Sequence, residues 1–227
     1  MIVCNDIVKE YTPGDSNTRA LNGISLQIAK GDFVAIMGTS GSGKSTLLNI
    51  LGGMDTVTEG SYRMEGIEVS ALDSLALHRF RKAHVGFVFQ NFALINQYTL
   101  RENVEVPLIA KGMPRKRRKA VAIEALGSVG LQDYCNSFPV NVSGGQQQRC
   151  AIARAIACGN ELLLADEPTG ALDSGNSDEV MQLFRKLNEE GKTIVMVTHD
   201  RHVAEYAKRI IFIEDGKIAG EERTTEQ

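Results

Sequence analysis

A glycine-rich segment at residues 38–45 lies between an apolar run at residues 33–37 and a helical pattern at residues 46–51. This order predicts a strand, a loop and the start of a helix. Glycines let successive backbone N–H groups face phosphate oxygens, and the helix dipole favours their negative charge. Lys44 could then reach the β- and γ-phosphates of a nucleotide, while the Ser45 hydroxyl could bind Mg²⁺. The residues expected to bind the nucleotide are Gly38, Thr39, Ser40, Gly41, Ser42, Gly43, Lys44, Ser45 and Thr46.

Two adjacent acids follow a second apolar run. Residues 162–165 predict a buried strand, and Asp166 and Glu167 come directly after it. Ligands of open α/β sheets bind at the carboxyl ends of the strands, which places both acids near the nucleotide. Asp166 is suited to Mg²⁺, directly or through water, and Glu167 to orienting or deprotonating the attacking water. Such acids can also serve only as a helix cap, but the phosphate loop favours the catalytic interpretation.

Composition narrows the class of protein. The chain has 227 residues, of which 43% are hydrophobic, so it can bury the core of one compact α/β unit. The formal net charge of −3 argues against a protein that binds nucleic acid. Cys4, Cys135, Cys150 and Cys158 lack Cys-x-x-Cys spacing, which favours reduced thiols over a disulfide or zinc framework. We expect Cys150 and Cys158 to be small core residues.

Apolar runs alternate with helical patterns along the chain. Buried strands are expected at residues 33–37, 85–89, 162–165, 193–197 and 209–213. Such continuous runs predict a mostly parallel sheet covered by helices on both faces. A smaller antiparallel sheet beside it is expected from residues 2–11, 24–28 and 61–64.

We expect one domain over residues 1–227. Residues 1–90 and 160–227 would form its core with the antiparallel sheet, and residues 91–159 a mainly helical lobe. No run approaches the length of a transmembrane helix and the first six residues lack signal-peptide features, so the chain is expected in the cytoplasm. The basic run at residues 115–119 is interpreted as a solvated helix start, with a phospholipid-headgroup or RNA contact as the alternative.

A third motif, Val-Ser-Gly-Gly-Gln-Gln-Gln-Arg at residues 142–149, lies a short distance before the acidic strand. It resembles the signature motif of ATP-binding cassette (ABC) ATPases. Ser143 can cap the following helix, and Gly144 and Gly145 expose backbone N–H groups at its positive end, which favours an anion. The resemblance implies that this anion is the γ-phosphate held by a second copy of the domain. Gln146 belongs to the same expected nucleotide contact.

The resemblance implies roles for four further residues. Gln90 resembles the Q-loop glutamine that reaches Mg²⁺ and the attacking water, and Asp173 resembles the D-loop residue at the dimer seam. His199 resembles the switch histidine that contacts the γ-phosphate. Tyr11 resembles the aromatic residue that stacks on adenine, although an aromatic at a strand end can also simply pack. The expected catalytic residues are Glu167, His199, Gln90 and Lys44, and the expected Mg²⁺ ligands are Ser45, Gln90 and Asp166.

Segments at residues 20–26, 87–95, 100–108 and 166–174 resemble the ATPase subunits of the macrolide-export and lipoprotein-release class. Bacitracin-type resistance systems share this pattern. The resemblance implies an α/β phosphate-loop ATPase of the ABC fold that uses ATP and Mg²⁺, dimerises head to tail and drives a membrane permease from the inner face of the membrane. The alternative is a regulatory protein of the same fold that signals to cell-wall hydrolases during division.

Some positions depart from the pattern, and one segment is unusually apolar. Relative to the ABC pattern, Val142 stands where leucine is usual and Thr39 stands where proline is frequent. Residues 159–161 also lack the usual proline between the signature helix and the acidic strand. None of these changes removes a catalytic group. Cys150 would make the site sensitive to thiol reagents if it were accessible. The permease is expected to dock on residues 91–107, whose apolar side chains are Phe92, Leu94, Ile95, Val104 and Val106.

Overall fold

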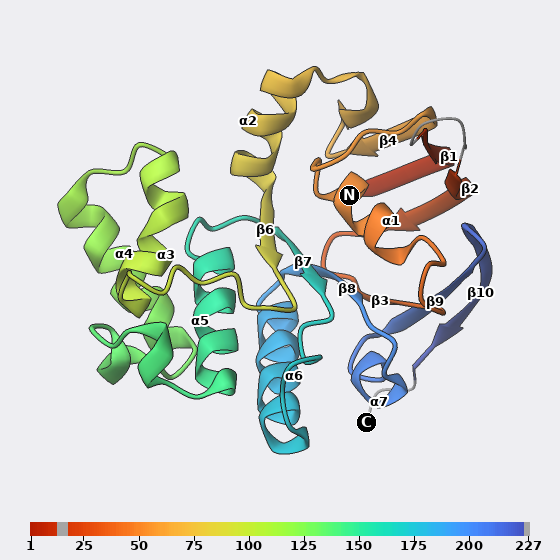
Figure 1. Cartoon of the computed structure of the whole chain (residues 1–227). Helices are drawn as coiled ribbons and strands as arrows, with labels where there is room; N and C mark the ends of the chain where they lie inside the picture. The colour runs from red at the N-terminus through yellow and green to blue at the C-terminus, as the bar shows by residue number, and fades with distance from the viewer. Residues whose placement is uncertain (13–17, 225–227) are drawn as a thin grey trace.

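The computed structural model describes residues 1–12 and 18–224, and its central sheet has six strands in the order β10-β9-β3-β8-β7-β6 (Figure 1). All neighbouring strands are parallel except the pair β9 and β10. The strands are β3 (Phe33–Met37), β6 (Val85–Val88), β7 (Leu162–Asp166), β8 (Thr193–Val197), β9 (Arg209–Glu214) and β10 (Lys217–Arg223). The mostly parallel sheet is therefore confirmed, with strand ends that differ from expectation by at most one residue.

Strand β10 was not predicted. It pairs antiparallel with β9 through a turn at Asp215 and Gly216, both of which have positive φ. Its side chains are mostly exposed and charged, so it lacks the apolar run by which the other five strands were found. An Asp-Gly pair is nevertheless typical of a two-residue hairpin turn, and this signal could have revealed the strand.

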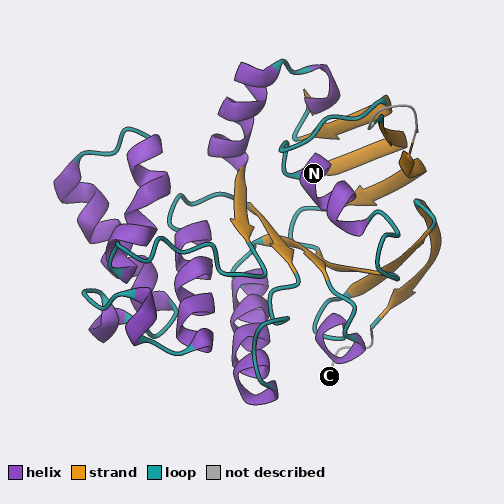
Figure 2. Cartoon of the chain, in the orientation of Figure 1, coloured by secondary structure: helices purple, strands orange, loops and turns teal. Residues whose placement is uncertain are grey.

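A second, antiparallel sheet has the order β2-β1-β4-β5. Its strands are β1 (Ile2–Tyr11), β2 (Thr18–Ile28), β4 (Glu59–Met64) and β5 (Ile67–Glu68). This confirms the predicted smaller sheet, although β2 and β4 begin earlier than expected and β5 was missed. In Figure 2 this sheet lies at the upper right, and the central sheet runs from the middle of the picture to the right.

Seven α-helices accompany the sheets in the described part of the chain. They are α1 (Lys44–Leu51), α2 (Ser74–His84), α3 (Leu100–Ala110), α4 (Arg115–Ser128), α5 (Gly144–Ile156), α6 (Ser174–Glu189) and α7 (Arg201–Ala204). Short 3₁₀ helices span Val69–Ala71, Gln132–Tyr134 and Pro139–Asn141. Helices α3, α4 and α5 pack against one another at one side of the sheet and are called the helical lobe below (Figure 1). The division of the chain at residues 90 and 160 stays a prediction.

Strand β3 explains why the central strands are apolar without interruption. Phe33 and Ala35 belong to the core formed with the helical lobe and α6, whereas Val34 and Ile36 belong to the core shared with α1 and the second sheet. Side chains alternate between the two faces of a strand, and here both faces are covered. Strand β3 ends at Met37, where the glycine-rich loop begins.

Burial confirms the prediction that Cys150 is a core residue and contradicts the prediction that Val104 contributes to a docking surface. Cys150 is fully buried and burial raises the pKa of its thiol to about 12, so it offers no reactive thiolate. Val104 is also fully buried, inside the helical lobe, and therefore cannot face a docking partner. Cys158 is half-buried at the edge of the same core. Among residues 1–12 and 18–224, no helix combines the length and apolarity needed to cross a membrane.

Candidate active site

The glycine-rich loop connects β3 to α1 and leaves no room for side chains at two of its glycines. A Cβ atom at Gly38 would lie 2.1 Å from the carbonyl oxygen of Ile213, and one at Gly43 would lie 2.4 Å from that of Ala20. Gly43 also has a φ of 102°, which favours glycine. Close packing against the surrounding backbone thus holds the loop in a curled shape at the start of α1.

Lys44 lies inside this curl. Its Nζ donates hydrogen bonds to the carbonyl oxygens of Gly38 (2.9 Å) and Thr39 (2.7 Å), and the residue is only 8% exposed. An ammonium group has three donors, so one remains for a ligand oxygen. Because water is largely excluded here, a phosphate that accepted this hydrogen bond would interact strongly with the cation.

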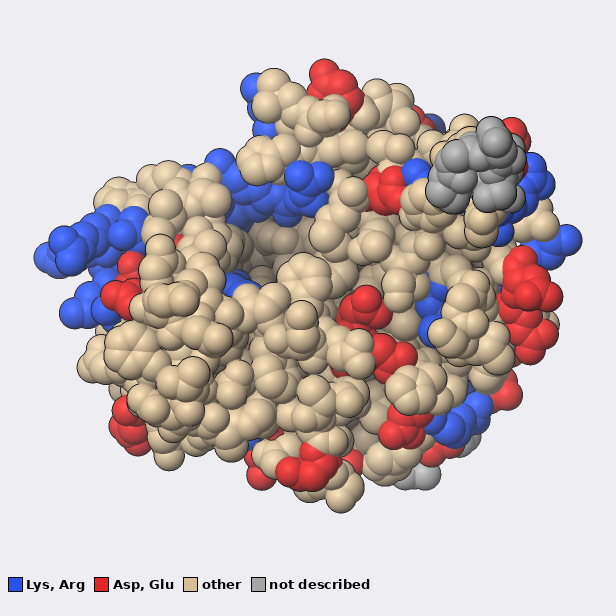
Figure 3. All heavy atoms as spheres, in the orientation of Figure 1, with Lys and Arg blue, Asp and Glu red and all other residues tan. Residues whose placement is uncertain are grey.

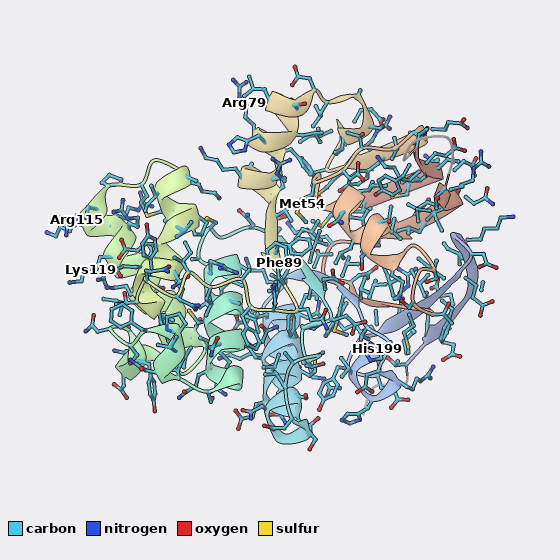
Figure 4. The ribbon with its side chains drawn as sticks, in the orientation of Figure 1. Met54, Arg79, Phe89, Arg115, Lys119 and His199 are labelled. Atoms are coloured by element: carbon cyan, nitrogen blue, oxygen red, sulfur yellow. The ribbon has the colours of Figure 1, made fainter. Side chains whose placement is uncertain are left out.

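A pocket of about 580 Å³ brings the loop together with Glu167 and His199. Of the residues predicted to contact the nucleotide, those that line it are Gly38, Thr39, Ser40, Gly41, Gly43, Lys44, Ser45 and Thr46. Ser42 is buried beneath the loop. His199 follows β8 at the carboxyl end of the sheet (Figure 4), where strand ends from distant parts of the sequence meet.

Asp166 ends β7 beside the loop. The Ser45 hydroxyl donates to Asp166 Oδ1 over 3.4 Å. Partial burial raises the pKa of the Asp166 carboxyl, against the opposing effect of this hydrogen bond. A half-buried carboxylate next to a hydroxyl, both oxygen ligands, is the donor set that a hard divalent cation prefers.

Glu167 adopts an unusual backbone conformation, with a φ of 45°. A residue other than glycine in this region costs about 1 kcal/mol, and such strain tends to be kept where it serves function. The Glu167 N–H donates to the Val197 carbonyl (2.9 Å), and Glu167 Oε1 lies 2.9 Å from His199 Nδ1. The two side chains predicted to act on the γ-phosphate and water are therefore in contact.

The signature segment lies elsewhere. Ser143 caps α5: its Oγ accepts from the Gln146 N–H (3.2 Å), and its own N–H donates to Gln146 Oε1 (2.9 Å). A Cβ at Gly145 would lie 2.2 Å from Asn176 Oδ1, so the start of α5 packs closely on α6. None of Ser143, Gly144, Gly145 and Gln146 lines the nucleotide pocket. One chain does not bring the two motifs together, and in Figure 1 α5 and α1 lie on opposite sides of β6 and β7.

Gln90 and Asp173 do not line the pocket. A Cβ at Gly170 would lie 2.9 Å from Gln90 Nε2, which places the Gln90 amide over the segment that follows Glu167. Asp173 caps α6 by accepting from the Asn176 N–H (2.9 Å), and the hydrogen bonds from Asn176 lower its pKa. Their predicted roles stay predictions.

Tyr11 ends β1 and is held by other side chains. Its hydroxyl donates to Asp55 Oδ2 (2.6 Å), and Lys9 Nζ lies 5.0 Å from the centre of its ring. Burial and the hydrogen bond to Asp55 raise the pKa of Tyr11. Tyr11 does not line the pocket and is 39% exposed, and its stacking on adenine stays a prediction.

Sequence reasoning missed Gln148. This residue is fully buried on α5, and its Nε2 donates to the Pro168 carbonyl over 2.5 Å. The bond links the signature helix directly to the residue after Glu167. A polar residue on the core-facing side of a helix is the signal that could have identified it.

The family described as ABC transporter matches residues 21–170. This chain belongs to the ABC transporter family. The cassette is 48% identical over 218 residues to the macrolide export ATP-binding/permease protein MacB of Escherichia coli K12, and 47% identical to MacB of Shigella dysenteriae serotype 1. In both cases the match covers 96% of this chain and 34% of the relative, so the chain spans about a third of the length of these relatives.

Solved structures give the same assignment of the fold. The ATP-binding cassette MJ0796, in a dimeric post-hydrolysis state bound to ADP and Pi, matches this cassette with a TM-score of 0.91 and 45% identity over the full length of both chains. A second dimeric structure of MJ0796 matches with the same TM-score and 46% identity. The fold is therefore that of an ABC ATPase, and the family binds nucleotide.

Proposed function

We propose that this cassette binds ATP with Mg²⁺ at the seam of a head-to-tail dimer, hydrolyses it, and drives a membrane permease. The observation that carries the proposal is the separation of motifs in one chain. The pocket with Lys44, Glu167 and His199 has no signature residues, while Ser143 presents a capped and exposed helix start elsewhere. Two chains in opposite orientation would complete both sites, and the dimeric relatives support this arrangement.

In this dimer, residues of both chains would surround the γ-phosphate. Lys44 would donate to the phosphate oxygens from one chain, and the backbone N–H groups beside Ser143 of the partner subunit would donate from the other. Glu167 would accept the proton of the attacking water, and His199, which contacts Glu167 in the structure, would orient the carboxylate and donate to the phosphate. The reaction is in-line phosphoryl transfer to water.

Mg²⁺ would be held by the Ser45 hydroxyl and the Asp166 carboxylate, with Gln90 approaching from the helical lobe. The 3.4 Å contact between Ser45 Oγ and Asp166 Oδ1 supports this, because a hard divalent cation prefers oxygen atoms of these kinds. When bound, the ion would neutralise charge on the β- and γ-phosphates.

The substitution Asp166→Asn should stabilise the nucleotide-free chain while weakening its Mg²⁺-dependent binding of ATP. The raised pKa of Asp166 means that its ionised form destabilises the folded state, and this penalty is fully present at pH 7. Removing this penalty should increase the free energy of unfolding by on the order of 1 kcal/mol or less, which corresponds to about 2 °C in Tm. This increase in stability should vanish when the pH falls below the pKa of Asp166 in the unfolded chain. Ser45→Ala is the control: it removes a ligand but no charge, so a similar rise in its Tm would contradict this explanation.

The permease would dock in a groove of about 410 Å³ between α2, β6, α3 and α5. Its apolar lining includes Val85, Phe87, Val106, Pro107 and Ala155. Of the five apolar residues predicted for docking, only Val106 lines this groove. Phe92 instead approaches the start of α5, where a Cβ at Gly144 would lie 3.8 Å from its Cζ. We therefore propose docking at the end of α3, which is only one part of the predicted segment at residues 91–107.

Val106→Glu should uncouple the two proteins. Arg81 and Lys82 also line the groove, but a carboxylate at Val106 would replace the apolar contact proposed at the end of α3. Stimulation by the permease should therefore fall at least about tenfold, while the ATPase rate of the isolated cassette stays within about twofold. Ile109→Glu is the matched control, because Ile109 lies on the same helix, is 53% exposed and does not line the groove. Equal losses in the two variants, or a loss of the basal rate in Val106→Glu alone, would contradict docking at this groove.

The permease is proposed to be of the macrolide-export, lipoprotein-release or antimicrobial-peptide resistance type, which would hold the cassette on the inner face of the membrane. The likeness to macrolide export proteins supports this over a regulatory role in cell division. Copurification of the cassette with its permease from detergent-solubilised membranes tests it. A cassette that copurifies only with cell-wall hydrolase regulators would overturn it.

A further inference from the structure

Four exposed cations lie within the first five residues of α4. They are Arg115, Lys116, Arg117 and Lys119, called the basic turn below. Figure 4 labels Arg115 and Lys119 at the outer edge of the helical lobe. The chain as a whole carries a formal charge of −3, so this concentration of positive charge is local.

The fifth cation of the run has a different role. Arg118 Nε donates to Glu105 Oε2 (2.8 Å), and Arg101 contacts the other oxygen of the same carboxylate. The Glu105 side chain is only 7% exposed, whereas each arginine side chain is 19% exposed. A nearly buried carboxylate between two guanidinium groups fixes the start of α4 against α3. The basic turn is therefore held in a defined place against α3, the helix that also supplies Val106 to the docking groove.

The position of the basic turn is unfavourable for the helix itself. The positive end of a helix dipole favours acids, but the first turn of α4 contains none and carries cations instead. Like charges at this spacing also repel one another. The four cations therefore add nothing to the stability of α4 itself.

The basic turn lies on the same face as the docking groove. Figure 3 shows lysine and arginine atoms gathered over α4 at one edge and again beside the end of α2, with a hollow between them. The cations on the α2 side include Arg81 and Lys82, which line the groove. If the groove faces a permease, the basic turn faces the membrane in which that permease is embedded.

We propose that the basic turn binds the anionic phospholipid surface beside the permease. This placement rests on the proposed function, because the docking groove defines which face points to the membrane. Phosphate groups of the lipids would accept hydrogen bonds from the four cations and attract their positive charge. Each Lys or Arg near such a surface contributes about fivefold in binding, so the four together account for roughly 10²-fold or more.

RNA fits the surface less well. Recognition of single-stranded RNA uses aromatic side chains on which bases stack, and residues 111–128 contain no aromatic residue. A flat, continuous anionic surface requires only exposed cations at the edge of the protein. The observations therefore favour lipid.

The test is sedimentation of the full chain, without permease, with vesicles of phosphatidylcholine alone or with 30% phosphatidylglycerol. The wild type should bind only the anionic vesicles, and less at 500 mM than at 50 mM NaCl. The variant R115Q/K116Q/R117Q/K119Q should bind about 10²-fold more weakly. The control K186Q/K208Q/K217Q/R223Q removes the same number of positive charges, from four exposed residues outside α2 and α4. It should bind the vesicles like the wild type.

Folding is checked separately: the Tm of the basic-turn variant should equal or exceed that of the wild type, since the removed charges oppose the helix dipole. Equal weakening of both quadruple variants would overturn the proposal, as would binding of single-stranded RNA that is tighter than vesicle binding and depends on the basic turn. Failure of the proposed function would instead be seen in the ATPase and coupling measurements. The ATPase rate of the isolated chain should be the same in the basic-turn variant and the wild type.

Discussion

Glu167→Gln is expected to slow ATP hydrolysis at least about 100-fold, the scale of losing one positioned acid or base, and to trap an ATP-bound dimer. Glutamine keeps the shape of glutamate but cannot accept the proton of the attacking water. Glu167 Oε1 lies 2.9 Å from His199 Nδ1, so the amide retains a polar partner and the loop should keep its conformation. In the wild type of the proposed dimer, hydrolysis would repeatedly break the contact that the γ-phosphate makes across the seam.

Sedimentation of Glu167→Gln with ATP and with ADP measures this directly. A dimer should form with ATP and a monomer should remain with ADP, because in the proposed dimer only the γ-phosphate would reach Ser143 and Gly145 of the partner subunit. An added Ser143→Arg change puts bulk and positive charge into the seam and should abolish the dimer. A variant that binds ATP tightly but stays monomeric would count against the composite site, as would a dimer that tolerates Ser143→Arg.

Lys44→Ala should weaken ATP binding at least about 100-fold. Lys44 is 8% exposed, and its ammonium group is positioned by the carbonyl oxygens of Gly38 and Thr39. Hydrogen bonds between charged groups contribute about 1.5–3 kcal/mol each, and water that replaces the side chain supplies no charge. Calorimetric titration with ATP gives the affinity, and a thermal melt shows that the loop still folds.

Lys186→Ala serves as the matched control, because Lys186 is an exposed lysine of α6 whose side chain is 61% exposed and does not line the pocket. It should bind ATP like the wild type. Unchanged affinity in Lys44→Ala, measured on a folded protein, would refute the assignment of the loop as the phosphate site.

The sequence alone determined the elements whose signal is local. Five central strands were predicted because both of their faces are buried, which requires continuous apolar runs. The phosphate loop, the acids after β7 and the cap of α5 were predicted because backbone geometry and hydrogen bonding there depend on a few adjacent residues. The resemblance of these motifs to ABC ATPases then identified the family that the comparisons show.

The tertiary structure decided what depends on distant contacts. Val104 and Val106 have the same residue type, and only the packing of α3 determines that one is buried while the other lines a groove. Strand β10 exists because β9 offers it an edge to pair with, and Gln148 acts through Pro168, twenty residues away. The distance between the phosphate loop and the signature helix is likewise set by the sheet between them. Local sequence specifies backbone conformation, whereas packing of the whole chain specifies which side chains meet.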